Sequence, residues 1–84
     1  MTVTLRLFAA AREAAGRGHD EFEPDRTPTV GALLEAAAAR YGPRFAEVVD
    51  CSRVWVNGDE PAAGSATNLA DGDEVAVLPP VSGG

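Results

Sequence analysis

Residues 69–84 read LADGDEVAVLPPVSGG, and this stretch constrains how the rest of the chain can fold. Asp71-Gly72-Asp73 predicts a tight turn, and residues 74–78 predict a short, largely apolar strand. Pro79 and Pro80 lack the N–H group that a sheet ladder needs, so strand pairing should end there. Gly83 and Gly84 then follow without side chains. The stretch therefore predicts a final strand, a stiff proline pair and a slender tip.

The start of the chain predicts the strands that would pair with this final one. Residues 2–8 alternate, with Val3, Leu5 and Leu7 on one side, and this predicts a strand with one buried face. Residues 9–15 are rich in alanine and predict a short helical turn that ends at Gly16. Residues 20–23 are expected to pair back as a second strand, with Phe22 pointing inward.

The middle of the chain predicts one main helix. Apolar residues recur at helical spacing on one face: Val30, Leu33, Leu34, Ala37, Ala38 and Tyr41. Thr29 is a good N-cap, and Gly42 stands where a left-handed C-terminal cap is expected. Pro43 cannot continue the helix, and residues 45–49 are expected to add a short helical turn.

Residues 54–56 predict a third strand, and Asn57-Gly58 behind it is a strong hairpin signal. The order is then strand, strand, helix, strand, strand. This order predicts an α+β protein of the ubiquitin-like β-grasp type, with a mixed sheet packed on one main helix and the first and last strands parallel at its centre. We expect a domain over residues 1–78 and an extended, flexible tail over residues 79–84.

Length and charge limit the classes of function. Eighty-four residues suffice for one domain with a modest core, so a deep active site built by this chain alone is not expected. The net charge is −6, and all seven basic residues are arginine, which argues against non-specific nucleic-acid binding. The acidic surface suits a basic protein partner, or it serves solubility alone. No membrane-spanning or secretory segment is evident, so we expect a cytoplasmic protein.

The tail suits chemistry on its terminal carboxylate. Six extended residues reach roughly 20 Å. A tip without side chains can thread a narrow tunnel in a partner enzyme. Adenylation by ATP would activate the carboxylate, and a sulfur donor could then displace AMP and leave a nucleophilic thiocarboxylate. The alternative is that the two glycines are an ordinary frayed terminus.

The chain resembles the MoaD/ThiS family of sulfur carriers, and within it most closely MoaD, the small subunit of molybdopterin synthase. The resemblance rests on residues 3–9 (VTLRLFA), on Arg12, Glu13 and Gly16, and above all on residues 69–84. Pro79-Pro80-Val81 favours MoaD over two other kinds of carrier in the family. These are ThiS, which supplies sulfur for the thiazole of thiamine, and the related carriers that supply sulfur for cysteine synthesis.

The resemblance implies that a MoeB-like enzyme adenylates Gly84 with ATP and that a sulfur donor protein then converts it to 1-thioglycine. It further implies that residues 79–83 (Pro79, Pro80, Val81, Ser82 and Gly83) insert into a MoaE-like large subunit and that the sulfur builds the dithiolene of molybdopterin. In this interpretation the chain is not catalytic alone and binds no cofactor; nucleic acid and membrane are not among the expected partners.

Five side chains outside the tail need separate consideration. Phe8 and Leu78 should face away from the inward residues and form an apolar patch for a partner, with ordinary core packing as the alternative. Trp55 is an outward candidate, although we favour a half-buried structural role. Cys51, the only cysteine, has no base nearby, and His19 should be a solvated strand residue. No spacing suggests a metal site or a phosphate-binding loop.

Two competing functions stay open at this point. A ubiquitin-like protein modifier would be joined through Gly84 to lysines of other proteins; the absence of lysine means that the chain could not form lysine-linked chains with itself. A plain interaction domain would use the tail for no chemistry.

Overall fold

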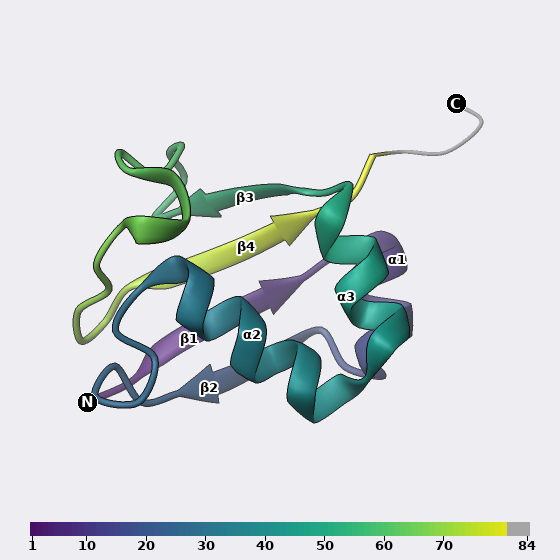
Figure 1. Cartoon of the computed structure of the whole chain (residues 1–84), viewed down its shortest axis with the longest axis horizontal. Coiled ribbons are helices and arrows are strands. Elements are labelled where there is room, and N and C mark those ends of the chain that lie inside the picture. Colours follow the sequence, from purple (N-terminus) through teal and green to yellow (C-terminus); the bar gives the residue numbers. More distant parts are fainter. Residues whose placement is uncertain (81–84) are drawn as a thin grey trace.

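The computed structural model describes residues 1–80; Val81, Ser82, Gly83 and Gly84 lie outside the described residues. The elements follow the predicted order, including the two short helical turns that were expected besides the main helix, and one 3-10 turn is added (Figure 1). They are β1 (Val3–Leu7), α1 (Ala9–Ala15), β2 (His19–Phe22), α2 (Val30–Tyr41), α3 (Pro43–Asp50), β3 (Arg53–Val56), the 3-10 turn η1 (Gly64–Ala66) and β4 (Glu74–Leu78).

The four strands form one mixed sheet in the order β2-β1-β4-β3. β1 and β4 are parallel at its centre, with Leu5 opposite Val75 and Leu7 opposite Val77. β2 pairs with β1 and β3 pairs with β4, both antiparallel. The predicted β-grasp arrangement of a central parallel pair is therefore confirmed.

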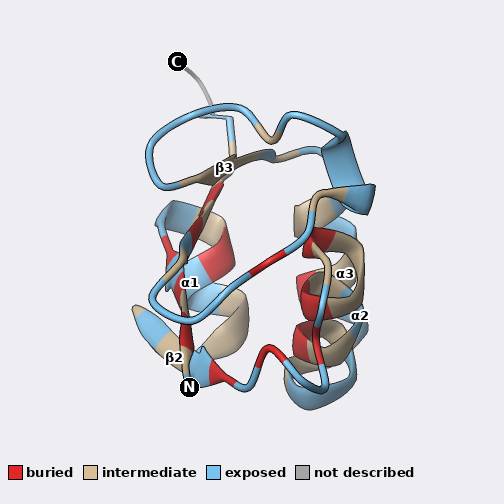
Figure 2. Cartoon of the chain, turned by 90° about the vertical axis from the view of Figure 1, so that its left-hand side faces the viewer, coloured by how far each residue is buried: buried red, intermediate tan, exposed pale blue. Residues whose placement is uncertain are grey.

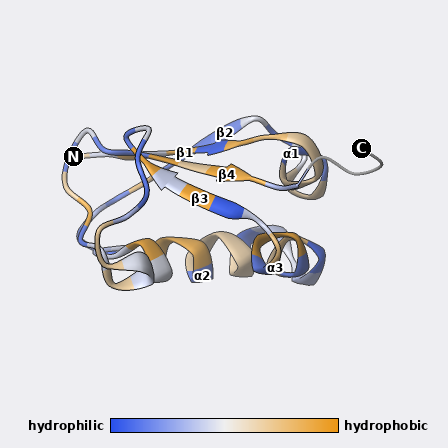
Figure 3. Cartoon of the chain, turned by 90° about the horizontal axis from the view of Figure 1, so that it is seen from above, coloured by the Kyte–Doolittle hydropathy of each residue, from blue (hydrophilic) through white to orange (hydrophobic). Residues whose placement is uncertain are grey.

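The sheet and the helices form two layers. α2 and α3 run along one face of the sheet, and no helix in residues 1–80 covers the opposite face (Figure 3). Buried residues gather between these layers (Figure 2). The core consists of Val3, Leu5, Leu7, Ala11, Phe22, Val30, Leu33, Ala37, Phe45, Leu69, Val75 and Val77. The predicted inward faces of the first strand and of the main helix are thus the observed ones.

The ends of α2 show one confirmed cap and one correction. The Thr29 hydroxyl accepts a hydrogen bond from the Ala32 N–H at 3.1 Å, as its N-cap role predicts. Gly42 has φ 108° and ψ 177°, which is not the left-handed helical conformation that we expected. The prediction was wrong because Gly42 also begins the next helix, with Pro43 in its first turn. The expected short turn is the two-turn helix α3, and it buries Phe45 completely.

The Asn57-Gly58 turn closes differently from the prediction. Both residues have positive φ, 52° and 85°, as a tight primed turn requires. The turn joins Val56 to Asp59 through hydrogen bonds of 2.8 and 3.0 Å, and it does not join β3 to β4. Residues 57–73 make the longer connection. They pack against the start of α2, where the Val30 N–H donates to the Thr67 carbonyl at 3.0 Å.

Candidate functional site

The predicted tail leaves the sheet at the end of a central strand. β4 ends at Leu78, whose partner in β3 is Arg53, and Pro79 and Pro80 follow outside any strand. Proline provides no ladder N–H, which explains why pairing stops at that point. Pro79 is half-buried and Pro80 is exposed. The chain leaves beyond the tip of β4, at the end of the sheet where α1 lies (Figure 1).

The remaining predicted tail residues, Val81, Ser82, Gly83 and Gly84, lie outside the described part of the chain. Their insertion into a partner and the chemistry at Gly84 stay predictions. Of the predicted tail, the structure describes Pro79 and Pro80.

Phe8 and Leu78 occupy equivalent steps of the two central strands. The parallel register pairs Leu7 with Val77, so each residue stands one position beyond a buried partner. Phe8 is 42% exposed, Leu78 is half-buried, and neither belongs to the core. The alternative of ordinary core packing therefore does not hold for Phe8, and the binding role of the pair stays a prediction.

A strained turn sets the position of Phe8. Ala9, which follows it, has φ 49°, a conformation that a side chain with a Cβ rarely adopts. The Phe8 carbonyl accepts from the N–H groups of Ala11 and Arg12 at 3.0 and 3.3 Å. The backbone thus reverses directly from β1 into α1, next to the end of β4.

A hollow that was not predicted lies at the base of the tail, and we call it the tail-root hollow. It has a volume of about 420 Å³ and is lined by Cys51, Arg53, Trp55, Leu78, Pro79 and Pro80. The strand alternation in β3 contains the signal, because Val54 and Val56 pack against the core and so leave Arg53 and Trp55 on the other face. Trp55 is half-buried but does not belong to the core, so its position matches the outward candidate.

The model of the ThiS family matches residues 5–84. The chain belongs to the ThiS family. This family comprises small sulfur-carrier proteins with the ubiquitin-like β-grasp fold, and the observed sheet order is consistent with it.

Individual relatives of this ThiS-family chain cover its whole length. "Small archaeal modifier protein 3" of Haloferax volcanii is 36% identical over 100% of both chains. "Molybdopterin synthase sulfur carrier subunit" of Mycobacterium tuberculosis is 36% identical over 98% of this chain and 96% of its own. The solved structure of SAMP1 from Haloferax volcanii matches with a TM-score of 0.83 at 34% identity, covering 100% of each chain.

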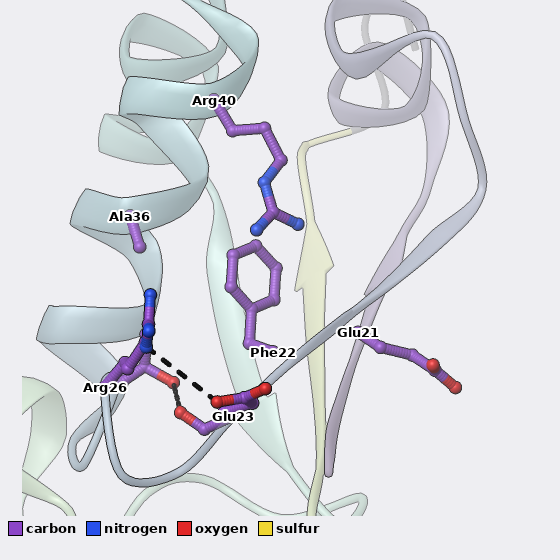
Figure 4. Close-up of a pocket in the computed structure, with 7 residues that line it drawn as sticks. Glu21, Phe22, Glu23, Arg26, Ala36 and Arg40 are labelled. Carbon is purple, nitrogen blue, oxygen red and sulfur yellow. Dashed lines mark hydrogen bonds and ion pairs between the residues drawn. The ribbon is translucent and has the colours of Figure 1, made fainter.

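A second hollow of this ThiS-family chain lies between β2 and α2 and is drawn in Figure 4. The Arg40 guanidinium stands over the Phe22 ring at 4.2 Å and also pairs with Asp20 at 2.8 Å. Arg26 pairs with Glu23 at 3.8 Å, while Glu21 points away from the hollow. Because its cations already have partners within the domain, we interpret this hollow as part of the structural network.

The side chains considered for catalysis in this ThiS-family chain do not come together. Cys51 is exposed, and its Sγ lies 3.3 Å from the Val48 carbonyl oxygen. His19 is exposed on β2, at the edge of the sheet opposite β3. Within residues 1–80, no group of three His, Cys, Asp or Glu side chains could hold a metal ion. None of the helices described there is long and apolar enough to cross a membrane.

Proposed function

We propose that this chain is the sulfur-carrier subunit of a molybdopterin synthase. In this role the Gly84 carboxylate attacks the α-phosphate of ATP on a MoeB-like enzyme and releases pyrophosphate. A sulfur donor protein then releases sulfur at the oxidation level of sulfide, which attacks the acyl-adenylate and displaces AMP. The resulting thiocarboxylate delivers this sulfur to a pterin precursor held by a MoaE-like large subunit.

One observation carries the proposal: the tail begins at a fixed point of the sheet, from which it can reach into a partner enzyme. The strand β4 ends at Leu78, and two prolines follow at once, so the tail starts from a central strand that is paired on both sides. A rigid base reduces the conformational freedom that is lost when the tail enters an enzyme. Relatives named "Molybdopterin synthase sulfur carrier subunit", at 34–36% identity, favour this pathway over thiamine or cysteine synthesis.

The test is co-expression with the MoeB-like and sulfur-donor proteins of the same genome, followed by intact-protein mass spectrometry. We expect replacement of one terminal oxygen by sulfur, and formation of molybdopterin when the large subunit and its pterin substrate are added. A chain lacking Gly83 and Gly84 is the matched control and should form neither. A loaded carrier that never yields molybdopterin, but restores thiamine or cysteine synthesis, would assign it to another pathway.

A second candidate, a protein modifier, is favoured by the relatives named "Small archaeal modifier protein" at 36% and 38% identity. In that role Gly84 would form isopeptide bonds with lysines of other proteins. Conjugates that survive boiling and reductant, and that require Gly84, would support it. Because the chain has no lysine, such conjugates should carry it as single units on their lysines.

A further inference from the structure

Trp55 faces away from the protein core. In β3 it stands between Val54 and Val56, which both pack against the core, and it pairs with Ala76 of β4. Since α2 and α3 cover the face that Val54 and Val56 join, Trp55 lies on the face without helices (Figure 3). A large aromatic residue on such a face contributes little to core packing.

Trp55 lines two hollows at this end of the sheet. One is the tail-root hollow, and the other, of about 270 Å³, is lined by Arg53, Val54, Glu60, Pro61 and Gly64 as well as Trp55. Because Trp55 is only half-buried, it has surface free to pack against another molecule. Aromatic residues that line such hollows are frequent anchors of protein interfaces.

Arg53 gives the tail-root hollow a positive edge. Among residues 1–80 it is the only charged residue that lines this hollow, although the whole chain carries a net charge of −6. Its ion-pair partner is Glu60 at 3.9 Å, and both side chains are more than 70% exposed. An exposed pair of this kind contributes little stability, so a carboxylate of another protein can replace Glu60.

We propose that Trp55 and Arg53 are a docking site for the enzyme that adenylates the tail, and that this enzyme contributes an apolar side chain paired with a carboxylate. The inference rests on the proposed function, because it assigns the partner as the activating enzyme. Pro79 and Pro80 line the same hollow, so an enzyme that holds the tail comes directly over Trp55. Leu78 joins this site to the predicted patch at Phe8. The net charge of the chain suggested a basic partner, whereas at this site the partner group that faces Arg53 is a carboxylate.

The test measures adenylation of the full-length chain by its activating enzyme, using pyrophosphate exchange at increasing carrier concentration. We expect Trp55→Ala to raise the half-saturating concentration about tenfold or more, and Arg53→Glu to raise it by a similar factor. The maximal rate should change little, because Gly84 is untouched. Arg44→Glu is the matched charge control; Arg44 is exposed in the first turn of α3 and does not line the tail-root hollow, so its reversal should leave both values unchanged.

Two further measurements separate docking from folding. The melting temperature of Trp55→Ala should stay close to that of the wild type, since Trp55 lies outside the core. The chain has one tryptophan, so 5-fluorotryptophan labelling gives a single ¹⁹F resonance, which should shift when the activating enzyme is added. The same labelled chain carrying Arg53→Glu should need more enzyme for the same shift.

The outcomes distinguish this inference from the proposed function. If the wild type is adenylated and Trp55→Ala is adenylated with the same half-saturation, the docking site is wrong and the carrier function stands. If adenylation depends on Trp55 but no molybdopterin forms, the docking site stands and the pathway is wrong. A wild-type chain that its activating enzyme never adenylates would overturn both.

Discussion

The phenolic hydroxyl of Tyr41, at the end of α2, donates a hydrogen bond to the Asp20 carboxylate in the edge strand β2. Arg40 and Arg17 pair with the same carboxylate at 2.8 and 3.2 Å, and its Oδ1 also accepts the Glu21 N–H at 2.8 Å. A single acidic side chain thus joins the outermost strand to the main helix. Asp20 also occupies a backbone donor of the sheet edge, which otherwise could pair with another chain.

Acid should destabilise the domain through Asp20. Burial, with 12% of the side chain exposed, opposes its charge, but hydrogen bonds from Tyr41, Arg40 and Glu21 outweigh burial and lower its pKa from 3.8 to about 2. A carboxyl group with a lowered pKa in the folded state contributes stability that is complete above the unfolded value and is lost below it. We expect the free energy of unfolding to fall between about pH 4 and pH 2.

Urea unfolding across this pH range checks the prediction. Asp20→Asn should lower stability at neutral pH by about 2 kcal/mol, because a charged hydrogen-bond network is lost, and should flatten the acid dependence. Glu21→Gln is the control, since Glu21 is an exposed neighbour on the same strand. An unchanged acid profile in Asp20→Asn would show that other carboxyl groups control acid unfolding.

Alkali should act through Tyr41. Burial and, after it, the hydrogen bond to Asp20 raise the pKa of Tyr41 to about 12. The unfolded chain releases this proton near its ordinary pKa of 10, so stability should be complete below about pH 10 and decline toward pH 12. The chain has one tyrosine and no lysine, which makes this interval simple to interpret.

Tyr41→Phe should remove the alkaline decline and also raise the pKa of Asp20, because the carboxylate loses its phenolic donor. Carboxyl ¹³C titration by NMR measures the second effect directly. If the Asp20 pKa is the same in Tyr41→Phe as in the wild type, Arg40 and the Glu21 N–H hold that carboxylate in its charged form without the phenol.

Gly31 should not tolerate a larger residue without loss of stability. A Cβ at this position would lie 3.1 Å from the Ser65 carbonyl oxygen and 3.2 Å from the Ser65 Cβ, where η1 crosses the first turn of α2. Alanine gains up to about 1 kcal/mol in helix propensity, so crowding must exceed that gain. Because hydrogen bonds from Val30 and Leu69 hold the loop, we expect Gly31→Ala to be destabilising by about 1 kcal/mol overall.

A double-mutant cycle with Ser65→Gly isolates this contact. Removal of the Ser65 Cβ should recover part of the loss caused by Gly31→Ala, as measured by chemical denaturation. Strictly additive effects of the two substitutions would place the cost elsewhere.

Ala9 should be improved by glycine. Its φ of 49° costs an alanine about 1 kcal/mol or more, and glycine adopts such angles freely. We expect Ala9→Gly to be stabilising by about 0.5 kcal/mol after the greater freedom of the unfolded chain is counted. Ala10→Gly, one residue further into α1, should instead be destabilising by about 1 kcal/mol. Thermal unfolding of both variants tests this prediction. If both substitutions change stability in the same direction, Ala9 is not strained.

The sequence predicted the core correctly where a strand or helix has a single apolar face that packs against the other layer. Leu5, Leu33 and Val77 could be predicted as core residues because strand and helix spacing each left a single apolar face. Gly42 was misassigned because α3 begins where α2 ends, so its conformation serves two helices. The alternation in β3 indicated which face Trp55 occupies, but the lining of the tail-root hollow depends on how β3 pairs with β4, because that pairing brings Cys51 and Trp55 to Pro80. The turn at Asn57 was predicted at the right position. It joins Val56 to Asp59 and not β3 to β4, because the chain continues into the long connection of residues 57–73.

The pairing of β1 with β4 also has a consequence for biosynthesis. The centre of the sheet joins the first strand to the last, so the domain cannot assemble until residues 74–78 have left the ribosome. Contacts between such distant segments slow folding. Any product cut short before Leu78 lacks a central strand and should be degraded as an unfolded chain. Under the proposed carrier function, an activating enzyme should therefore rarely meet a folded competitor that premature termination has cut short before the tail.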